Sequence, residues 1–272
     1  MSGSTARPAL LLAHGAGGSV AANYGPMMEQ LRARYRVIGI DYPGAGSTPR
    51  ATRRLELDEL ADRLTAAADA EGVGRFAVSG FSLGGAVAIR LAARHPERVT
   101  ALALTAPFAR ADTGVRLTAR VWRSLIAAGD TDTLGRFLLA RCLSPAALEA
   151  MDPQELETAV KETGAGVPVG TPEHVELVER LDVTADLARI TAPTLVVSPV
   201  DDPLIPPRLH RAVATGIRGA RLVEIAGGHL PFAEHPDRWA ALLTDGLTDG
   251  LAPGSASGVS DRLADGGTDG EE

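Results

Sequence analysis

A serine held between glycines is the residue of this 272-residue chain whose surroundings point most directly to chemistry. Ser82 lies in Gly80-Phe81-Ser82-Leu83-Gly84, after an apolar run and before a helical one. The glycines lack the Cβ atoms that would collide where a strand reverses into a helix, so the hydroxyl would be exposed at the turn. The pattern predicts a nucleophile, although the pentapeptide alone also fits a tight connection whose serine caps the helix.

A serine hydroxyl becomes a strong nucleophile when an imidazole takes its proton and a carboxylate orients that imidazole. The apolar run 193–198 predicts a buried strand that leads to Asp202, and the run 221–225 predicts another strand that leads, through a glycine-rich loop, to His229. Serine, acid and histidine in this order are expected after such a turn. Because the carboxyl ends of parallel strands meet at one edge of a sheet, we expect the three side chains to converge.

A second glycine-rich turn follows the predicted strand 9–13 and reads His14-Gly15-Ala16-Gly17-Gly18. Such a turn can direct a backbone N–H group toward an oxygen that gains negative charge during acyl transfer. We expect the N–H groups of Ala16 and Leu83 to form this oxyanion hole.

With these motifs in this order, the chain resembles the α/β-hydrolase superfamily over roughly residues 8–245, and within it the esterase, enol-lactonase and C–C hydrolase branch. The resemblance implies that His14 and Gly15 support the oxyanion loop and that His14 is not the base. The related haloalkane dehalogenases and epoxide hydrolases carry aspartate in place of Ser82, which argues against both activities.

Two neighbouring aspartates, Asp201 and Asp202, could supply the carboxylate of the Ser-His-Asp catalytic triad. The catalytic aspartate of related chains is typically followed by a proline four residues on, and Asp202 with Pro206 has that spacing whereas Asp201 does not. We therefore choose Asp202 and interpret Asp201 as a solvated turn residue.

Strand-like and helical runs alternate along both ends of the chain, which predicts an α/β fold: a mostly parallel sheet with helices on both faces. Strands are predicted near 9–13, 36–41, 75–79 and 99–105 and helices near 26–34, 55–71 and 83–94. We assign residues 1–106 and 191–246 to the hydrolase core, residues 107–190 to a helical cap inserted after the sixth family strand, and residues 247–272 to a disordered tail. The cap would exclude water and shape the acyl pocket.

Only seven residues precede Pro8, whereas most relatives have two further strands there, so we expect the first two family strands to be missing. The sheet edge would then be exposed or covered by another subunit, which makes a homodimer possible. Five apolar cap residues are expected to be packing residues rather than substrate contacts. They are Trp122, Leu125, Ile126, Phe137 and Leu138.

Composition fits one enzyme domain, with 45% hydrophobic residues and a net charge of −7, which argues against a nucleic-acid partner. The single cysteine, Cys142, is expected to be a small buried apolar residue. Zinc-binding spacing, a phosphate loop, a signal peptide and a membrane-spanning run are missing, so we expect no metal, no cofactor, no membrane partner and a cytoplasmic location.

The other histidines receive structural roles from the sequence. His95 is expected to end the helix after the serine, His235 to fix a local bend before a proline, and His174 and His210 to lie at the surface.

The sequence thus predicts a serine hydrolase that acts on a small ester, lactone or thioester through an acyl-enzyme. The same residues also serve a C–C hydrolase, a lyase or a tailoring enzyme of secondary metabolism. A ligand receptor that retains the triad is a further alternative.

Overall fold

The centre of the molecule is a parallel β-sheet. The computed structural model describes residues 7–249, and within them six strands pair in the order β2-β1-β3-β4-β5-β6, each parallel to its neighbours. The strands are β1 (Ala9–Ala13), β2 (Arg36–Gly39), β3 (Phe76–Phe81), β4 (Val99–Thr105), β5 (Thr194–Pro199) and β6 (Arg221–Ile225). This sheet confirms the predicted fold class, and no strand precedes β1 in the described part of the chain.

The strand order creates a crevice at one point of the sheet. β1 and β3 are neighbours although the chain forms β2 between them. The connections that leave β1 and β3 therefore run to opposite sides, and ligands of open α/β sheets bind at the carboxyl ends of such a pair. The glycine-rich turn after β1 and the serine turn after β3 both lie here.

Both faces of the sheet are buried along its four central strands, β1, β3, β4 and β5, as their apolar sequences require, whereas the edge strands β2 and β6 are partly exposed. Leu10 and Leu12 of β1 pack in one hydrophobic cluster, while Leu11 and Ala13 pack in another. This period of two is expected for a strand whose successive side chains point to opposite faces.

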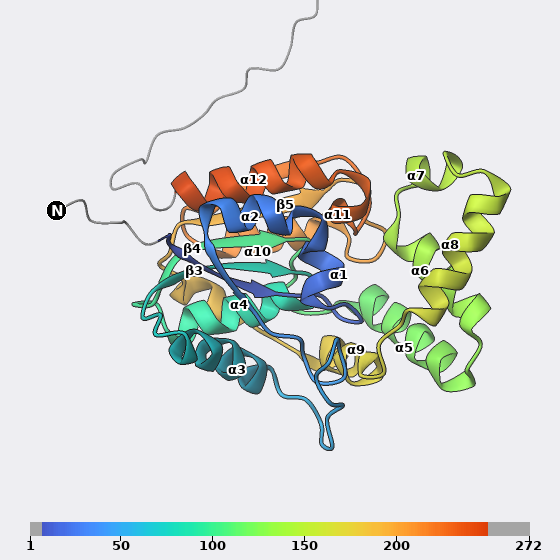
Figure 1. Cartoon of the computed structure of the whole chain (residues 1–272), viewed down its shortest axis with the longest axis horizontal. Helices are drawn as coiled ribbons and strands as arrows, with labels where there is room; N and C mark the ends of the chain where they lie inside the picture. The colour runs from blue at the N-terminus through green and yellow to red at the C-terminus, as the bar shows by residue number, and fades with distance from the viewer. Residues whose placement is uncertain (1–6, 250–272) are drawn as a thin grey trace, which may run out of the picture.

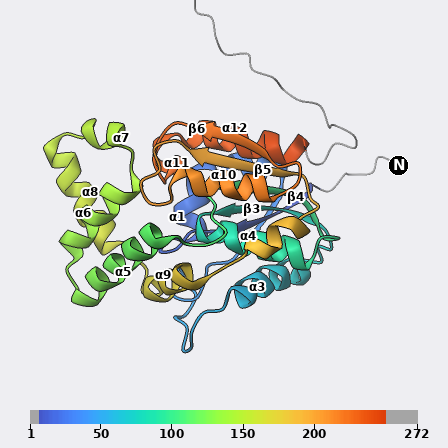
Figure 2. The same ribbon diagram turned by 180° about the vertical axis from the view of Figure 1, so that it is seen from behind.

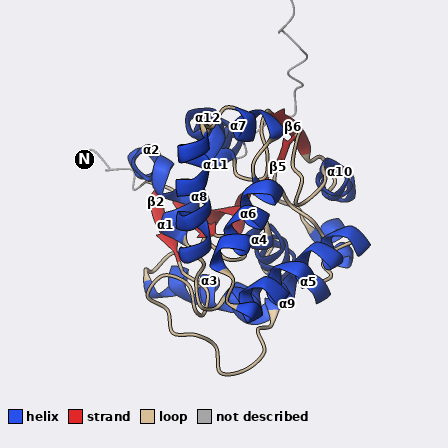
Figure 3. Cartoon of the chain, turned by 90° about the vertical axis from the view of Figure 1, so that its right-hand side faces the viewer, coloured by secondary structure: helices blue, strands red, loops and turns tan. Residues whose placement is uncertain are grey.

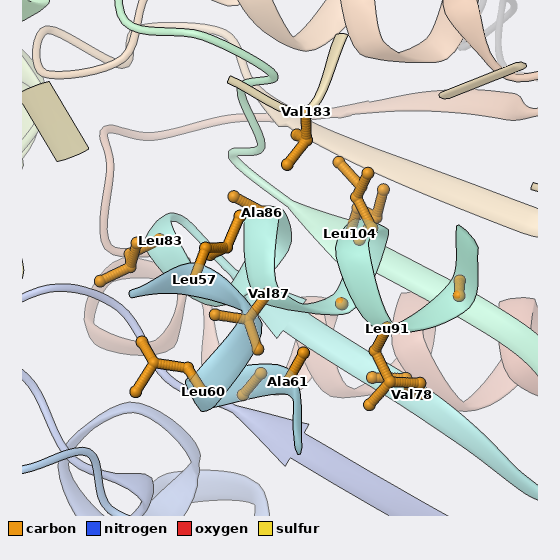
Figure 4. Close-up of a cluster of buried hydrophobic side chains, with 14 of the residues drawn as sticks. Leu57, Leu60, Ala61, Val78, Leu83, Ala86, Val87, Leu91, Leu104 and Val183 are labelled. Carbon is orange, nitrogen blue, oxygen red and sulfur yellow. The ribbon is translucent and has the colours of Figure 1, made fainter. Parts of the chain in front are cut away.

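Helices cover the two faces (Figures 1 and 2). The helical elements outside the segment between β4 and β5 are α1 (Val20–Tyr24), the 3-10 helix η1 (Gly25–Met27), α2 (Met28–Arg34), α3 (Leu57–Ala70), α4 (Leu83–Arg94), α10 (Pro207–Gly216), α11 (Pro231–Glu234) and α12 (Pro236–Asp249). Helices α1, α2 and α12 pack over Leu10 and Leu12, and helices α3, α4 and α10 pack over the opposite face, in the cluster that contains Leu11 and Ala13. Figure 4 shows part of this cluster, with side chains from α3, α4 and β3.

The segment between β4 and β5 is helical, as its sequence predicts. Its elements are α5 (Thr113–Ala128), α6 (Thr131–Cys142), α7 (Pro145–Glu149), α8 (Pro153–Ala165), α9 (Thr171–Arg180) and the 3-10 helix η2 (Thr184–Arg189). Four successive helices begin after a side chain that accepts a backbone N–H of the first turn, which explains why they start where they do. These caps are Asp112, Asp130, Ser144 and Asp152.

The helices of this segment have different neighbours. In Figure 3, α6 and α8 lie in front of the sheet, and Leu138 of α6 and Thr163 of α8 line one cavity together with residues that follow β1 and β3. In α9, Val175 and Val178 line the same cavity, and Leu177 and Val178 also belong to the large cluster that contains side chains of α3 and α4. The helix that α9 contacts most is α5 of the same segment. The division into a core and a cap at 107–190 stays a prediction.

The C-terminal boundary differs from the sequence prediction. α12 continues to Asp249, and Leu247, which we placed in the disordered tail, is fully buried in the cluster on the α12 face. The leucine completes the apolar stripe of that helix, so its burial extends the helix beyond residue 246. The rest of the predicted tail lies outside the described residues. None of the helices in residues 7–249 combines the length and hydrophobicity needed to span a bilayer.

Candidate active site

The serine turn has the strained geometry that its glycines predict. Ser82 adopts φ 52° and ψ −117°, a left-handed value that is uncommon for a residue with a side chain. A Cβ atom on Gly80 would lie 2.4 Å from the carbonyl oxygen of Gly84, and one on Gly84 would lie 2.0 Å from that of Ala13. Ser82 makes no capping hydrogen bond to α4. The alternative of a helix-capping serine is therefore excluded.

Three side chains from three strand ends form a continuous chain of hydrogen bonds. The hydroxyl of Ser82 lies 3.0 Å from Nε2 of His229, and Nδ1 of His229 lies 2.7 Å from Oδ2 of Asp202. Because the carboxylate can only accept, Nδ1 carries the proton and Nε2 is left as the acceptor for the serine hydroxyl. All three residues are buried, with Ser82 at 6% exposure.

The acid in this chain is Asp202, not Asp201. The second carboxylate oxygen of Asp202 accepts the N–H groups of Leu204 and Ile205, which holds the side chain in one orientation. Asp201 is exposed, and its backbone N–H donates to the carbonyl of Gly227. The proline spacing therefore selected the residue that faces His229.

The two predicted oxyanion donors come from opposite sides of the crevice. Leu83 is the first residue of α4, where a backbone N–H has no partner within the helix. Ala16 borders the same cavity as Ser82, and within the described residues no protein acceptor takes its N–H. The arrangement can offer two N–H groups to an oxygen placed above the serine.

His14 holds the loop that carries Ala16. Its Nδ1–H donates to the carbonyl of Gly15 over 2.8 Å, and its Nε2 accepts the N–H of Tyr42 over 2.9 Å. Burial lowers the pKa of His14 to about 3, so the ring is neutral and keeps this arrangement at neutral pH. Neither nitrogen is free to take a proton from Ser82.

A cavity of about 240 Å³ opens above Ser82 and His229. Apart from the reacting side chains, Asn23 and Thr163, the side chains that line it are apolar or those of Cys142 and Trp122. Of the five apolar residues expected to pack, Trp122 and Leu138 are buried in one hydrophobic cluster and also line this cavity, whereas Leu125, Ile126 and Phe137 are partly buried against that cluster and do not line this cavity. Burial raises the pKa of Cys142 to about 12, so it stays a neutral thiol.

Two histidines that the sequence placed at the surface are buried instead. His210 lies on α10 with Nδ1 3.0 Å from the hydroxyl of Ser198 and Nε2 3.5 Å from Oδ2 of Asp202. His174 lies on α9, and Gly17 donates its N–H to Nδ1 of His174 over 3.3 Å. Burial lowers the pKa of His210 to about 4 and also lowers that of His174.

Helical spacing could have revealed both burials. The buried positions of α9 include Thr171, Val175 and Val178, which share one helical face with residue 174. On α10, Val213 is buried three residues after position 210. His174 and His210 interrupt otherwise apolar buried faces of α9 and α10, which makes the helical periodicity harder to recognise in the sequence.

Sequence reasoning also missed Glu234. Its Oε1 accepts the backbone N–H groups of Ser144 and Gly228, and its Oε2 accepts the hydroxyl of Ser144. Because Gly228 directly precedes His229, this carboxylate ties the histidine loop to the start of α7. His95 follows the end of α4, as predicted, and His235 lies between the end of α11 and the start of α12.

The strand order, with its crevice between β1 and β3, and the serine turn beside that crevice define the class of hydrolases built on this scaffold. The chain belongs to the α/β hydrolase fold family, whose model matches residues 8–236. Within residues 7–249 no group of three or more histidine, cysteine or acidic residues is arranged to hold a metal ion.

Similar proteins support the same class. The chain is 33% identical to pyrrolizixenacetamide deacetylase of Xenorhabdus hominickii, over 87% of the chain and 89% of the deacetylase. It is 32% identical to a pimeloyl-[acyl-carrier protein] methyl ester esterase of Neisseria meningitidis serogroup B, over 80% of the chain and 85% of the esterase. A hydrolase structure from Pseudomonas aeruginosa superimposes with a TM-score of 0.75 and 27% identity, covering 89% of this chain and 90% of that one. The chain is accordingly an enzyme of the hydrolase class.

Proposed function

We propose that this protein is a serine hydrolase that cleaves a small ester, lactone or thioester through an acyl-enzyme on Ser82. The observation that carries the proposal is the hydrogen-bonded chain from Ser82 through His229 to Asp202, which opens into a largely apolar cavity. A cavity of this kind suits a small substrate whose reacting carbonyl is attached to an apolar group. We place the enzyme in the cytoplasm, an expectation that still rests on the sequence.

The first half of the reaction forms the acyl-enzyme. Nε2 of His229 takes the proton of Ser82 as the serine oxygen attacks the carbonyl carbon, and the N–H groups of Ala16 and Leu83 stabilise the oxyanion. Asp202 stabilises the imidazolium through Nδ1. His229 then gives its proton to the leaving oxygen or sulfur, and the tetrahedral intermediate collapses to an ester on Ser82.

The second half releases the acid. A water molecule takes the place of the leaving group, His229 removes its proton, and the resulting hydroxide attacks the acyl-enzyme. The oxyanion forms again between Ala16 and Leu83, and Ser82 leaves with the proton held by His229. The enzyme returns to its starting state without a cofactor.

Amides are a second candidate substrate class. The name of the Xenorhabdus hominickii relative describes removal of an acetyl group from an acetamide, and the mechanism differs only in that His229 protonates a leaving nitrogen. Ester, thioester and acetamide substrates therefore belong in one activity screen.

The test combines turnover with labelling of the nucleophile. We expect wild-type protein to hydrolyse short p-nitrophenyl esters and Ser82→Ala to lose on the order of 10⁶ in turnover with an unchanged melting temperature. A fluorophosphonate should add one label per chain, on Ser82. Unchanged activity in Ser82→Ala would refute the proposal.

The reaction in H₂¹⁸O separates the alternatives that share these residues. A hydrolase of esters, thioesters, amides or carbon–carbon bonds places ¹⁸O in the acid product, whereas a lyase does not. Product identification by mass spectrometry then distinguishes the bond that was cleaved. A ligand receptor would show melting shifts with ligand but no turnover.

A further inference from the structure

His174 occupies a junction of three segments that are distant in the sequence. The fully buried ring, carried by α9, lies between the glycine-rich turn after β1 and the loop after β2. Its ring centroid lies 6.1 Å from that of His14 and 5.9 Å from that of Tyr42. The reaction described above uses neither nitrogen of this ring.

The hydrogen bonds of His174 determine which nitrogen carries its proton. Nε2 lies 3.0 Å from the carbonyl oxygen of Pro43, which can only accept, so Nε2 is the donor. Nδ1 is then left with a lone pair, and Gly17 donates its backbone N–H to it. The lowered pKa of His174 is consistent with a neutral ring that keeps this lone pair.

The contacts around Gly17 leave little room for the loop to move. Gly17 has a φ of +67°, and a Cβ atom there would lie 3.0 Å from side-chain atoms of both Thr171 and Trp122. Beside it, Gly170 donates its N–H to the carbonyl of Gly44 over 3.0 Å. The start of α9 is therefore joined closely to both loops.

Ala16 lies between two peptide planes, and a histidine holds each of them. The Ala16 N–H shares a rigid plane with the carbonyl of Gly15, which accepts from His14. The next plane contains the N–H of Gly17, which donates to His174. Fixing both planes fixes the backbone of Ala16, and hence the direction of its N–H.

We propose that His174 is a positioning residue that holds the Ala16 N–H in place for the oxyanion through its bond to Gly17. This inference rests on the proposed function, because it concerns a donor in that reaction. The segment between β4 and β5 thereby takes part in the catalytic geometry through the oxyanion loop. The N–H donors of an oxyanion hole stabilise the transition state because they are oriented before negative charge develops on the carbonyl oxygen. A loosened loop therefore lowers kcat rather than the affinity for substrate.

Two substitutions separate this role from simple packing. His174→Asn keeps an acceptor at the position of Nδ1 and loses the bond to Pro43. His174→Gln keeps a donor near the position of Nε2 and places only methylene groups beside Gly17. His95→Asn, at the end of α4 and remote from the loop, is the control for replacing a histidine.

We expect His174→Gln to lower kcat by about 10- to 100-fold with little change in KM, because a displacement near 1 Å in a reacting geometry has that effect. His174→Asn should retain most of the wild-type kcat, although both variants lose one hydrogen bond. Equal kcat values in the two variants, or losses that follow their melting temperatures alone, would overturn the proposal.

A second measurement is independent of any substrate. Hydrogen exchange should accelerate at the Gly17 amide in His174→Gln but not in His174→Asn or His95→Asn. Unchanged exchange in His174→Gln would overturn the role of His174 even if the protein hydrolyses esters. Absence of hydrolysis in the wild type would instead refute the proposed function, while the exchange experiment still decides whether His174 holds the loop.

Discussion

Adding one methyl group at Gly84 should disable the site without touching a reacting side chain. The second residue of α4 packs so closely on the end of β1 that its Cβ atom would lie 2.0 Å from the Ala13 oxygen and 2.7 Å from the His14 oxygen, whereas ordinary contact begins at 3.4 Å. Both neighbours are backbone atoms, which cannot move away by changing a rotamer. In Gly84→Ala, α4 and β1 must separate.

The required separation is about 1 Å, and such a displacement of reacting groups can lower a rate on the order of 100-fold. Leu83 moves with α4 and Ala16 moves with the end of β1, so the distance between the two oxyanion donors changes directly. We also expect a loss of about 1–3 kcal/mol in the free energy of unfolding from the overpacked contact. The assay is kcat on a short ester, together with urea denaturation of the same preparation.

Gly85→Ala is the matched control because it adds the same atom one position further along the helix. Its Cβ atom would lie 3.2 Å from the Cβ of Pro107, a small conflict that a slight shift of the proline relieves. Helix propensity gives this change up to about 1 kcal/mol in its favour. If Gly84→Ala were as active and as stable as Gly85→Ala, the close packing of α4 on β1 would not position the two donors.

Three further predictions concern the surroundings of the site. Trp122→Ala enlarges the cavity above Ser82, so the preferred ester should shift toward longer acyl or alcohol groups, measured as kcat/KM across a chain-length series; an unchanged profile would remove Trp122 from the substrate site. Glu234→Ala leaves two backbone N–H groups without their acceptor and should cost about 1–3 kcal/mol in urea denaturation, whereas Glu234→Gln, which keeps a carbonyl oxygen, should cost much less. The pKa of His210 is lowered from 6.5 to about 4, so the unfolded chain binds a proton between these values that the folded chain does not. Stability is therefore full above pH 6.5 and falls toward pH 4 at about 1.4 kcal/mol per pH unit for each such histidine, and His210→Phe should make the measured slope shallower by that amount.

The sheet and the central part of the site could be predicted because their signals are local. Gly80 is required by the Gly84 carbonyl four residues away, whereas Gly84 is required by Ala13 and His14 at the end of β1. The Gly-x-Ser-x-Gly spacing shows both glycines in the sequence, and Asp202 and His229 each follow a strand. Residues that follow parallel strands lie at the same edge of the sheet, whichever helices connect those strands. The start of the first helical region was predicted less accurately. The sequence predicts a helix from residue 26, whereas helical structure begins six residues earlier at Val20, after the N-cap Ser19.

The supporting residues could not be predicted with the same ease because their partners come from other elements. His174 and His210 carry polar side chains whose burial depends on Gly17, Pro43 and Ser198, none of which is near in sequence. Burial of a polar side chain costs free energy that its hydrogen bonds offset, and a single sequence does not show those bonds. Helical spacing would have indicated that both positions are buried, but not what each imidazole holds.

The segment between β4 and β5 contacts each of the three loops that build the site outside the serine turn. His174 binds the oxyanion loop at Gly17, Arg141 donates to the carbonyl of Pro203 beside the acid, and Ser144 shares Glu234 with the histidine loop. The same segment supplies the wall of the cavity. Substitutions that change the shape of the cavity therefore also affect the positions of the loops, because the same helices line the cavity and hydrogen-bond to the loops. A change of substrate preference made in α5 or α6 should keep its catalytic rate only where these three contacts are retained.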